Sequence, residues 1–118
     1  MNWKNFMAVY KYQVEISDVA KEDIIRNINY ISYNKKSPGI AQTVLRGFRK
    51  QIENLSDSPK RHSLDEDEEL SKLQIRKHYF KHYKIYYIVD DVQKIVYILR
   101  VLHMLVNSKA LLIHMLEE

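Results

Sequence analysis

The sequence predicts a small α+β domain, in which a helical hairpin packs on a mostly antiparallel four-stranded sheet and a short helix ends the chain. Apolar residues recur at helical spacing in two consecutive segments joined by a short turn. Alternating apolar runs, typical of strands, precede and follow this pair. With 118 residues, 46% of them hydrophobic, we expect one domain over residues 1–118, with an N-terminal extension at 1–9 and a core at 10–116.

The first strand and the hairpin are predicted within residues 10–55. Residues 10–16 alternate and are rich in Tyr and Val, which indicates a strand. Ser17 and Asp18 are candidate N-caps, because their side-chain oxygens can accept hydrogen bonds from the first helical turn. Two helical stripes follow, separated by turn residues at 35–39: Ala20, Ile24, Ile28 and Ile31, then Ala41, Leu45, Phe48, Ile52 and Leu55. Two such helices should pair as an antiparallel hairpin.

The second half of the chain predicts three strands and a final helix. Residues 60–69 are polar and end in an acidic run, so we expect a solvated loop. Strands are expected at 73–79, 82–89 and 94–102, with a final helix at 108–116. The last strand is apolar on both faces. With the hairpin on one face of the sheet, the C-terminal helix or a partner chain must therefore cover the other.

Positive charge is concentrated in residues 71–103, which contain seven Lys or Arg and three His against two Asp. The rest of the chain has twelve Lys or Arg against thirteen Asp or Glu. A local excess of this kind indicates an anionic partner. The absence of cysteine excludes disulfides and cysteine-based zinc sites. Without a secretory leader or an apolar run of about 18 residues, we expect a cytoplasmic protein without membrane contact.

Five segments in a regular order carry a family resemblance: 14–24, 38–41, 75–76, 83–90 and 98–103, the last followed by Asn107. In order and spacing they resemble the RelE/ParE superfamily of toxins from bacterial type II toxin-antitoxin systems. The resemblance implies a RelE/ParE-like fold and a toxin held inactive by a cognate antitoxin, whose extended C-terminal segment wraps it. The expected assembly is a toxin-antitoxin hetero-oligomer, and the apolar sheet surface makes a homodimer of the lone toxin conceivable.

The family resemblance leaves the target open. RelE-like members cleave mRNA in the ribosomal A site, whereas ParE-like members poison DNA gyrase without hydrolysing anything. We favour a ribosome-dependent, metal-independent mRNA endonuclease. The alternatives are a non-enzymatic gyrase inhibitor and a degenerate, non-toxic module that binds antitoxin.

The endonuclease hypothesis predicts three candidate catalytic residues. Cleavage by a 2′-hydroxyl needs a base, a cation for the phosphate and an acid for the leaving oxygen. By resemblance, Arg76 and Arg100 occupy phosphate-contacting positions and His103 lies near the acid/base position. The alternatives are an ion pair of Arg100 with an acidic residue on the antitoxin or the sheet rim, and a structural hydrogen bond for His103. RelE-like nucleases usually carry Tyr or His-Tyr just past the last strand, whereas Met104 follows His103 here.

Three lysines, Lys77, Lys81 and Lys84, would extend a cationic surface for nucleic acid. We expect no metal and no cofactor. His78 and His82 lie four residues apart, which is a ligand spacing only on a helix, and they fall on a predicted strand and turn.

Overall fold

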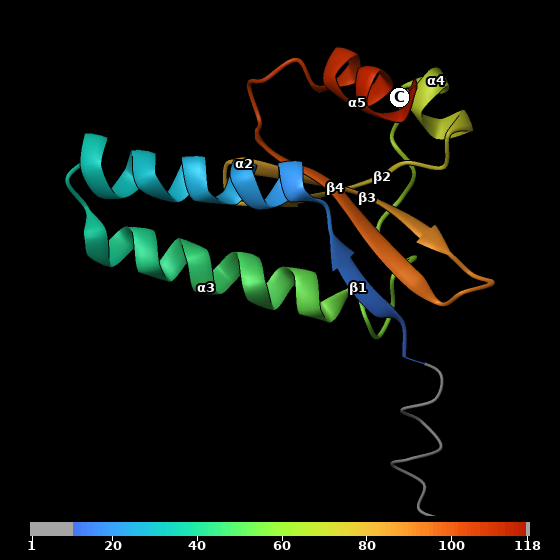
Figure 1. Cartoon of the computed structure of the whole chain (residues 1–118), viewed down its shortest axis with the longest axis horizontal. Helices are drawn as coiled ribbons and strands as arrows, with labels where there is room; N and C mark the ends of the chain where they lie inside the picture. Colours follow the sequence, from blue (N-terminus) through green and yellow to red (C-terminus); the bar gives the residue numbers. More distant parts are fainter. Residues whose placement is uncertain (1–10, 118) are drawn as a thin grey trace, which may run out of the picture.

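A four-stranded sheet forms the centre of the computed structural model, which describes residues 11–117 (Figure 1). In spatial order the strands are β1 (Gln13–Ile16), β4 (Ile95–His103), β3 (Tyr83–Asp90) and β2 (Arg76–Phe80). The β1–β4 pair is parallel and the other two pairs are antiparallel, which confirms the predicted sheet. Tyr10 and the extension at 1–9 lie outside the described residues.

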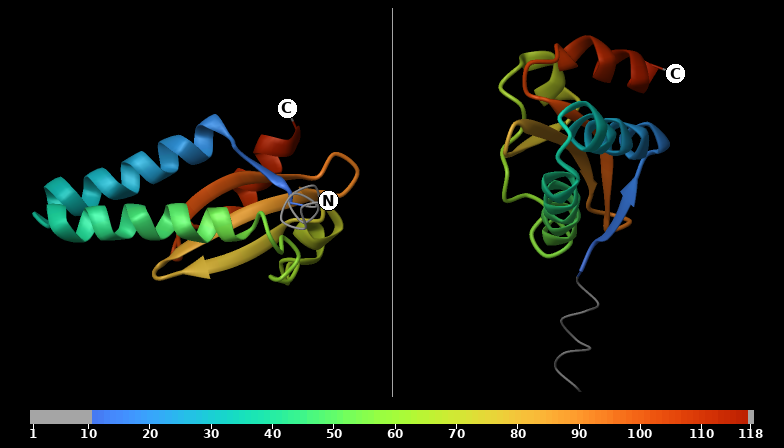
Figure 2. Two further views of the ribbon diagram at one scale, coloured as in Figure 1. Left: turned by 90° about the horizontal axis from the view of Figure 1, so that it is seen from below. Right: turned by 90° about the vertical axis from the view of Figure 1, so that its left-hand side faces the viewer.

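The hairpin consists of α2 (Asp18–Asn29), a single π-helical turn η1 (Tyr30–Asn34) and α3 (Pro38–Asn54). As predicted, Ser17 caps α2, since its hydroxyl accepts a hydrogen bond from the Ala20 amide at 3.0 Å. Apolar side chains of both helices, Phe48 and Ile52 among them, pack with Tyr87 on one face of the sheet. The turn end of the hairpin extends past the β2–β3 turn (Figure 2). None of the helices within residues 11–117 is long and apolar enough to cross a membrane.

The opposite face of the sheet is covered by α4 (Glu68–Lys72) and α5 (Ser108–Glu117) (Figure 1). Leu70 of α4 and Leu112 of α5 pack there with Tyr86, Leu99 and Leu102. Of the two predicted covers, the C-terminal helix or a partner chain, the structure places the C-terminal helix on this face, together with α4.

The prediction of a solvated loop over residues 60–69 was wrong at the acidic end of this segment, where α4 begins. The Asp67 carboxylate accepts hydrogen bonds from the amides of Glu69 and Leu70. Acidic side chains at this point also favour a helix N-terminus, because they face the positive end of its dipole. The same run therefore starts a helix, while Glu66, Glu68 and Glu69 remain exposed.

The ladder between β3 and β4 contains a β-bulge. Tyr86 pairs with Arg100, whereas the next residue, Tyr87, pairs with Ile98, so Leu99 is the extra residue. A bulge bends its strand and redirects the side chains beside it. Here Leu99 packs on the α4–α5 face, while Arg100 reaches α2.

Candidate functional site

Arg100, a predicted catalytic residue, forms a two-point ion pair with Asp23 of α2. Its Nε lies 2.7 Å from Asp23 Oδ2 and its Nη2 lies 2.9 Å from Oδ1. Asp23 is fully buried and also accepts a hydrogen bond from the Val101 amide at 3.0 Å. Hydrogen bonding to this carboxylate raises the pKa of Arg100. The guanidinium thus links α2 to the bulge of β4. The sequence analysis expected an ion-pair partner on the antitoxin or the sheet rim, whereas the structure provides a buried carboxylate of α2.

Arg76 and Lys77 lie at the start of the edge strand β2, where the preceding loop folds over them. Arg76 Nη1 donates to the His62 carbonyl at 2.7 Å. Lys77 Nζ lies 2.8 Å from Glu66 Oε1 and 3.4 Å from Asp65 Oδ2. Burial disfavours the charge of Lys77, but its bonds with these two carboxylates raise its pKa overall. The acidic run thus neutralises one of the lysines expected to contact nucleic acid.

The other two predicted nucleic-acid lysines differ in exposure. Lys84 is buried on the α4–α5 face, where its Nζ donates to the Val106 carbonyl at 2.9 Å. Burial lowers the pKa of this ammonium. Lys81 is exposed in the β2–β3 turn, with its Nζ 5.8 Å from the centre of the Phe80 ring. Of the three lysines, Lys81 alone is exposed to solvent.

His103 ends β4 at the end of the sheet where β3 begins, whereas Arg76 lies at the level of the middle of β3. Its Nδ1 accepts a hydrogen bond from the Leu105 amide at 3.2 Å, and its ring lies edge-on to Tyr83 at 5.8 Å between centres. Along the ladders, Arg76 pairs with Tyr87, whereas His103 pairs with Tyr83. Four residues of β3 separate these two levels, a distance of roughly 13 Å at about 3.3 Å per residue. The structure does not bring Arg76 and His103 together around one phosphate.

A stacked pair of imidazoles, His62 and His78, was missed by the sequence reasoning. Their ring centres lie 3.7 Å apart, and His78 Nε2 lies 2.6 Å from Gln51 Oε1 of α3. Burial, with the nearby charges of His62 and Arg61, lowers the pKa of His78 to about 4. The pair depends on a loop folding back onto β2, and no local pattern in the sequence signals that contact.

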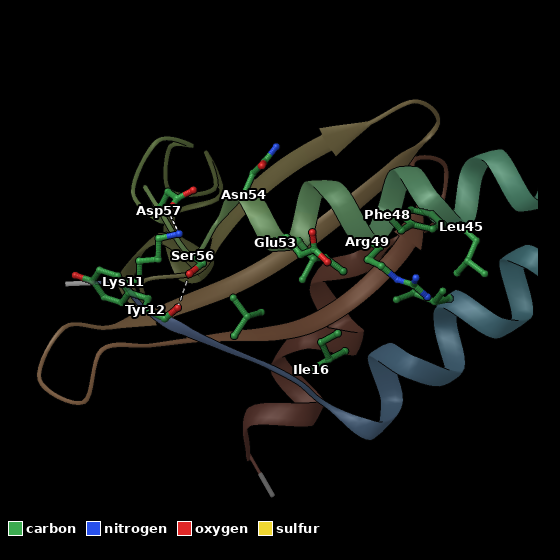
Figure 3. Close-up of a pocket in the computed structure, with 13 residues that line it drawn as sticks. Lys11, Tyr12, Ile16, Leu45, Phe48, Arg49, Glu53, Asn54, Ser56 and Asp57 are labelled. Atoms are coloured by element: carbon green, nitrogen blue, oxygen red, sulfur yellow. Dashed lines mark hydrogen bonds and ion pairs between the residues drawn. The ribbon is translucent and has the colours of Figure 1, made fainter. Parts of the chain in front are cut away.

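An apolar groove of about 690 Å³ runs between α3 and the edge strand β1 (Figure 3). Its apolar lining residues are Val14, Ile16, Ile24, Leu45, Phe48 and Ile52. Charged side chains of both signs, Arg49 and Glu53 from α3 and the Lys11–Asp57 ion pair (3.3 Å), also line it. Its apolar floor and mixed charge suit a peptide segment better than a polyanion.

The free edge of β1 adds backbone groups beside this groove. Gln13 and Ser17 donate their amides to β4, at 2.9 and 3.0 Å. In a parallel ladder alternate residues point the same way, so the amides and carbonyls of Val14 and Ile16 point away from β4. The outward groups of Tyr12 are already bonded to Ser56, at 3.1 and 2.7 Å. A short stretch of strand edge is thus open to an added segment.

Comparisons with known proteins agree with this architecture. Residues 14–105 match the family model of the ParE toxin of type II toxin-antitoxin systems, parDE. A solved structure of the chromosomal ParDE toxin-antitoxin system from P. aeruginosa is similar at a TM-score of 0.64 and 14% identity, covering 80% of this chain and 97% of that one. The RelBE2 toxin-antitoxin complex from Mycobacterium tuberculosis is similar at a TM-score of 0.54 and 26% identity, covering 79% and 98%. No curated protein matches the sequence.

Proposed function

Since this chain belongs to the ParE toxin family of type II toxin-antitoxin systems, we propose that it arrests growth by binding DNA gyrase and not by cutting RNA. The sequence alone favoured the endonuclease. The geometry of the candidate residues supports the gyrase inhibitor instead.

One observation carries this proposal: the three candidate catalytic residues do not form a site. RNA cleavage needs acid, base and cation within hydrogen-bonding reach of one phosphate. Arg100 is held in a two-point ion pair by a buried carboxylate. Arg76 is bonded to a loop carbonyl and lies four positions along β3 from the level of His103. Inhibition through protein contacts requires no such convergence.

We also propose that the cognate antitoxin binds in the groove between β1 and α3. An extended segment can pair with the outward backbone groups of Val14 and Ile16 while its apolar side chains fill the groove. The mixed charge at the groove suits a segment with both acidic and basic residues. The similarity to solved structures of toxin-antitoxin systems supports an antitoxin as the partner.

Induction of the chain in cells without antitoxin tests the proposed function. Two readouts are taken from the same culture: primer extension on abundant mRNAs and linearisation of a resident plasmid. We expect broken DNA and intact mRNA, because gyrase poisoning leaves cleaved DNA complexes. The variant Arg76→Ala should retain toxicity, with soluble yield and unfolding midpoint as controls for folding. Cuts within reading frames that disappear in His103→Ala would instead establish the endonuclease, and normal growth would indicate a binding module.

A further inference from the structure

A second cavity, of about 540 Å³, lies between the turn end of the hairpin and the end of the sheet where β4 stops. We call it the hairpin cavity. It shares no lining residue with the groove at β1. Its walls come from the turn end of the hairpin, from the β2–β3 turn with the first residue of β3, and from the end of β4.

The polar lining of the hairpin cavity is cationic. Lys35 and Lys81 line it together with His82 and His103, and its lining includes no Asp or Glu. Lys35 lies over the Tyr30 ring at 5.7 Å and Lys81 over the Phe80 ring at 5.8 Å. Within residues 11–117 neither ammonium forms an ion pair. We refer to these two lysines and two histidines as the rim group; it suits acidic groups.

The lining also includes apolar side chains, and some of the apolar side chains at or near the cavity are exposed. Val44 is buried in its floor and Ile31 is partly buried. Ile40 is 61% exposed and Tyr30 51% exposed at the cavity itself, and Leu105, two residues past His103, is 86% exposed. Exposed aliphatic side chains favour a protein partner over nucleic acid, because they neither stack on bases nor bond to phosphates. An isoleucine and a leucine at this exposure instead suit an apolar anchor residue.

We propose that the hairpin cavity is the surface through which this toxin docks on its target, and that the occupant is a segment of gyrase with an apolar anchor side chain beside acidic residues. The inference rests on the proposed function. The two concave sites differ in the charge of their lining residues and should therefore bind different ligands. The groove is lined by both acidic and basic side chains, whereas the charged side chains of the hairpin cavity are all basic. Antitoxin and target would then occupy different surfaces of the toxin.

The test reverses charge at the rim group in the full chain. The double variant Lys35→Glu with Lys81→Glu is compared with Lys21→Glu with Lys50→Glu, which changes two exposed lysines outside the cavity and alters net charge equally. Affinity for purified gyrase and for the antitoxin is measured by biolayer interferometry, with DNA supercoiling as the activity readout. We expect the rim variant to bind gyrase at least about tenfold more weakly and to lose inhibition. Its antitoxin affinity should stay within about twofold, which also shows that it is folded.

Contrary results separate the two proposals. If wild type and the rim variant inhibit gyrase equally, the docking surface is wrong and the proposed function stands. If the wild-type toxin neither binds nor inhibits gyrase, the proposed function fails and the docking partner fails with it. Binding of a single-stranded RNA oligonucleotide that only the rim variant loses would show that the occupant is a nucleic acid, which also overturns the inference.

Discussion

Two groups of cationic and imidazole side chains on and around this sheet differ in their bonding partners. The bonded group comprises Arg76, Lys77, His78, Lys84 and Arg100, each with a protein partner within 3.0 Å. The side chains of the rim group make ring contacts, and within residues 11–117 their one hydrogen bond is accepted by His103 from the Leu105 amide. In the sequence, members of both groups belong to one cationic stretch. Residue type therefore does not show which charged side chains support the fold and which are available to a ligand. Their bonding partners and their burial do.

The largest effect should come from removing the partner of Arg100. Asp23→Ala leaves a mostly buried guanidinium without its carboxylate and the Val101 amide without an acceptor. We expect the free energy of unfolding to fall by about 3–5 kcal/mol in urea denaturation. The control Asp18→Ala removes an exposed carboxylate of the same helix, 4.0 Å from Lys21, and should cost less than about 1 kcal/mol. Equal losses in the two variants would mean that Arg100 is not held by the fold.

A smaller effect should appear as pH dependence of stability, through His78. The folded pKa of about 4 lies below the ordinary value of 6.5, so the unfolded chain takes up the proton first as pH falls. Stability from this group is complete above about pH 6.5 and is lost between pH 6.5 and pH 4, by about 2 kcal/mol for this partly buried side chain. His78→Gln should flatten this slope, whereas His82→Gln, a change in the rim group, should leave it. If the free energy of unfolding depends on pH in the same way in His78→Gln and wild type, His78 is not the source of this pH dependence.

The hairpin and strands were predictable from the sequence because their signals are local. Helical stripes and strand alternation each arise within some fifteen residues, and Ser17 caps α2 from the adjacent position. The candidate site was not predictable in the same way. The link from Arg100 to Asp23 joins residues 77 apart and depends on a bulge at Leu99 that no sequence pattern marks. Lys84 belongs to an alternating strand, and only the position of α5 and of the segment before it shows that it is buried.

A third prediction concerns Phe80, which precedes two members of the rim group in the β2–β3 turn. A Cβ at Gly47 of α3 would overlap the Phe80 ring, lying 2.9 Å from Cε2 and closer to Cζ. Gly47→Ala gains up to about 1 kcal/mol in helix propensity, but overpacking costs about 1–3 kcal/mol. We expect a net loss of about 1 kcal/mol in urea denaturation and weaker target binding, because Phe80 must shift together with Lys81 and His82.

Gly39 provides the matched control for this substitution. A Cβ there would meet nothing within 4 Å, in the first turn of the same helix. Gly39→Ala should therefore leave stability unchanged or raise it by up to about 1 kcal/mol. If Gly47→Ala is as stable as Gly39→Ala, the turn that carries Lys81 is not positioned by this contact.

The smallest expected effect compares one lysine from each group. Lys84 is buried, and burial lowers its pKa, so keeping its ammonium charged there costs free energy. Its bond to the Val106 carbonyl offsets part of that cost, but Val106 is itself exposed and water can replace the ammonium as donor. Lys84→Met keeps the aliphatic volume and removes the charge, so we expect stability to rise by up to about 1 kcal/mol. The stability of Lys81→Met should stay within about 0.5 kcal/mol of wild type, since Lys81 is exposed in the turn.

Unfolding in urea checks the stability of both lysine variants, and gyrase affinity should fall in Lys81→Met alone. A loss of stability above about 1 kcal/mol in Lys84→Met would show that its ammonium stabilises the fold, while an equal loss of gyrase affinity in both variants would place Lys84 among the charges that contact the target.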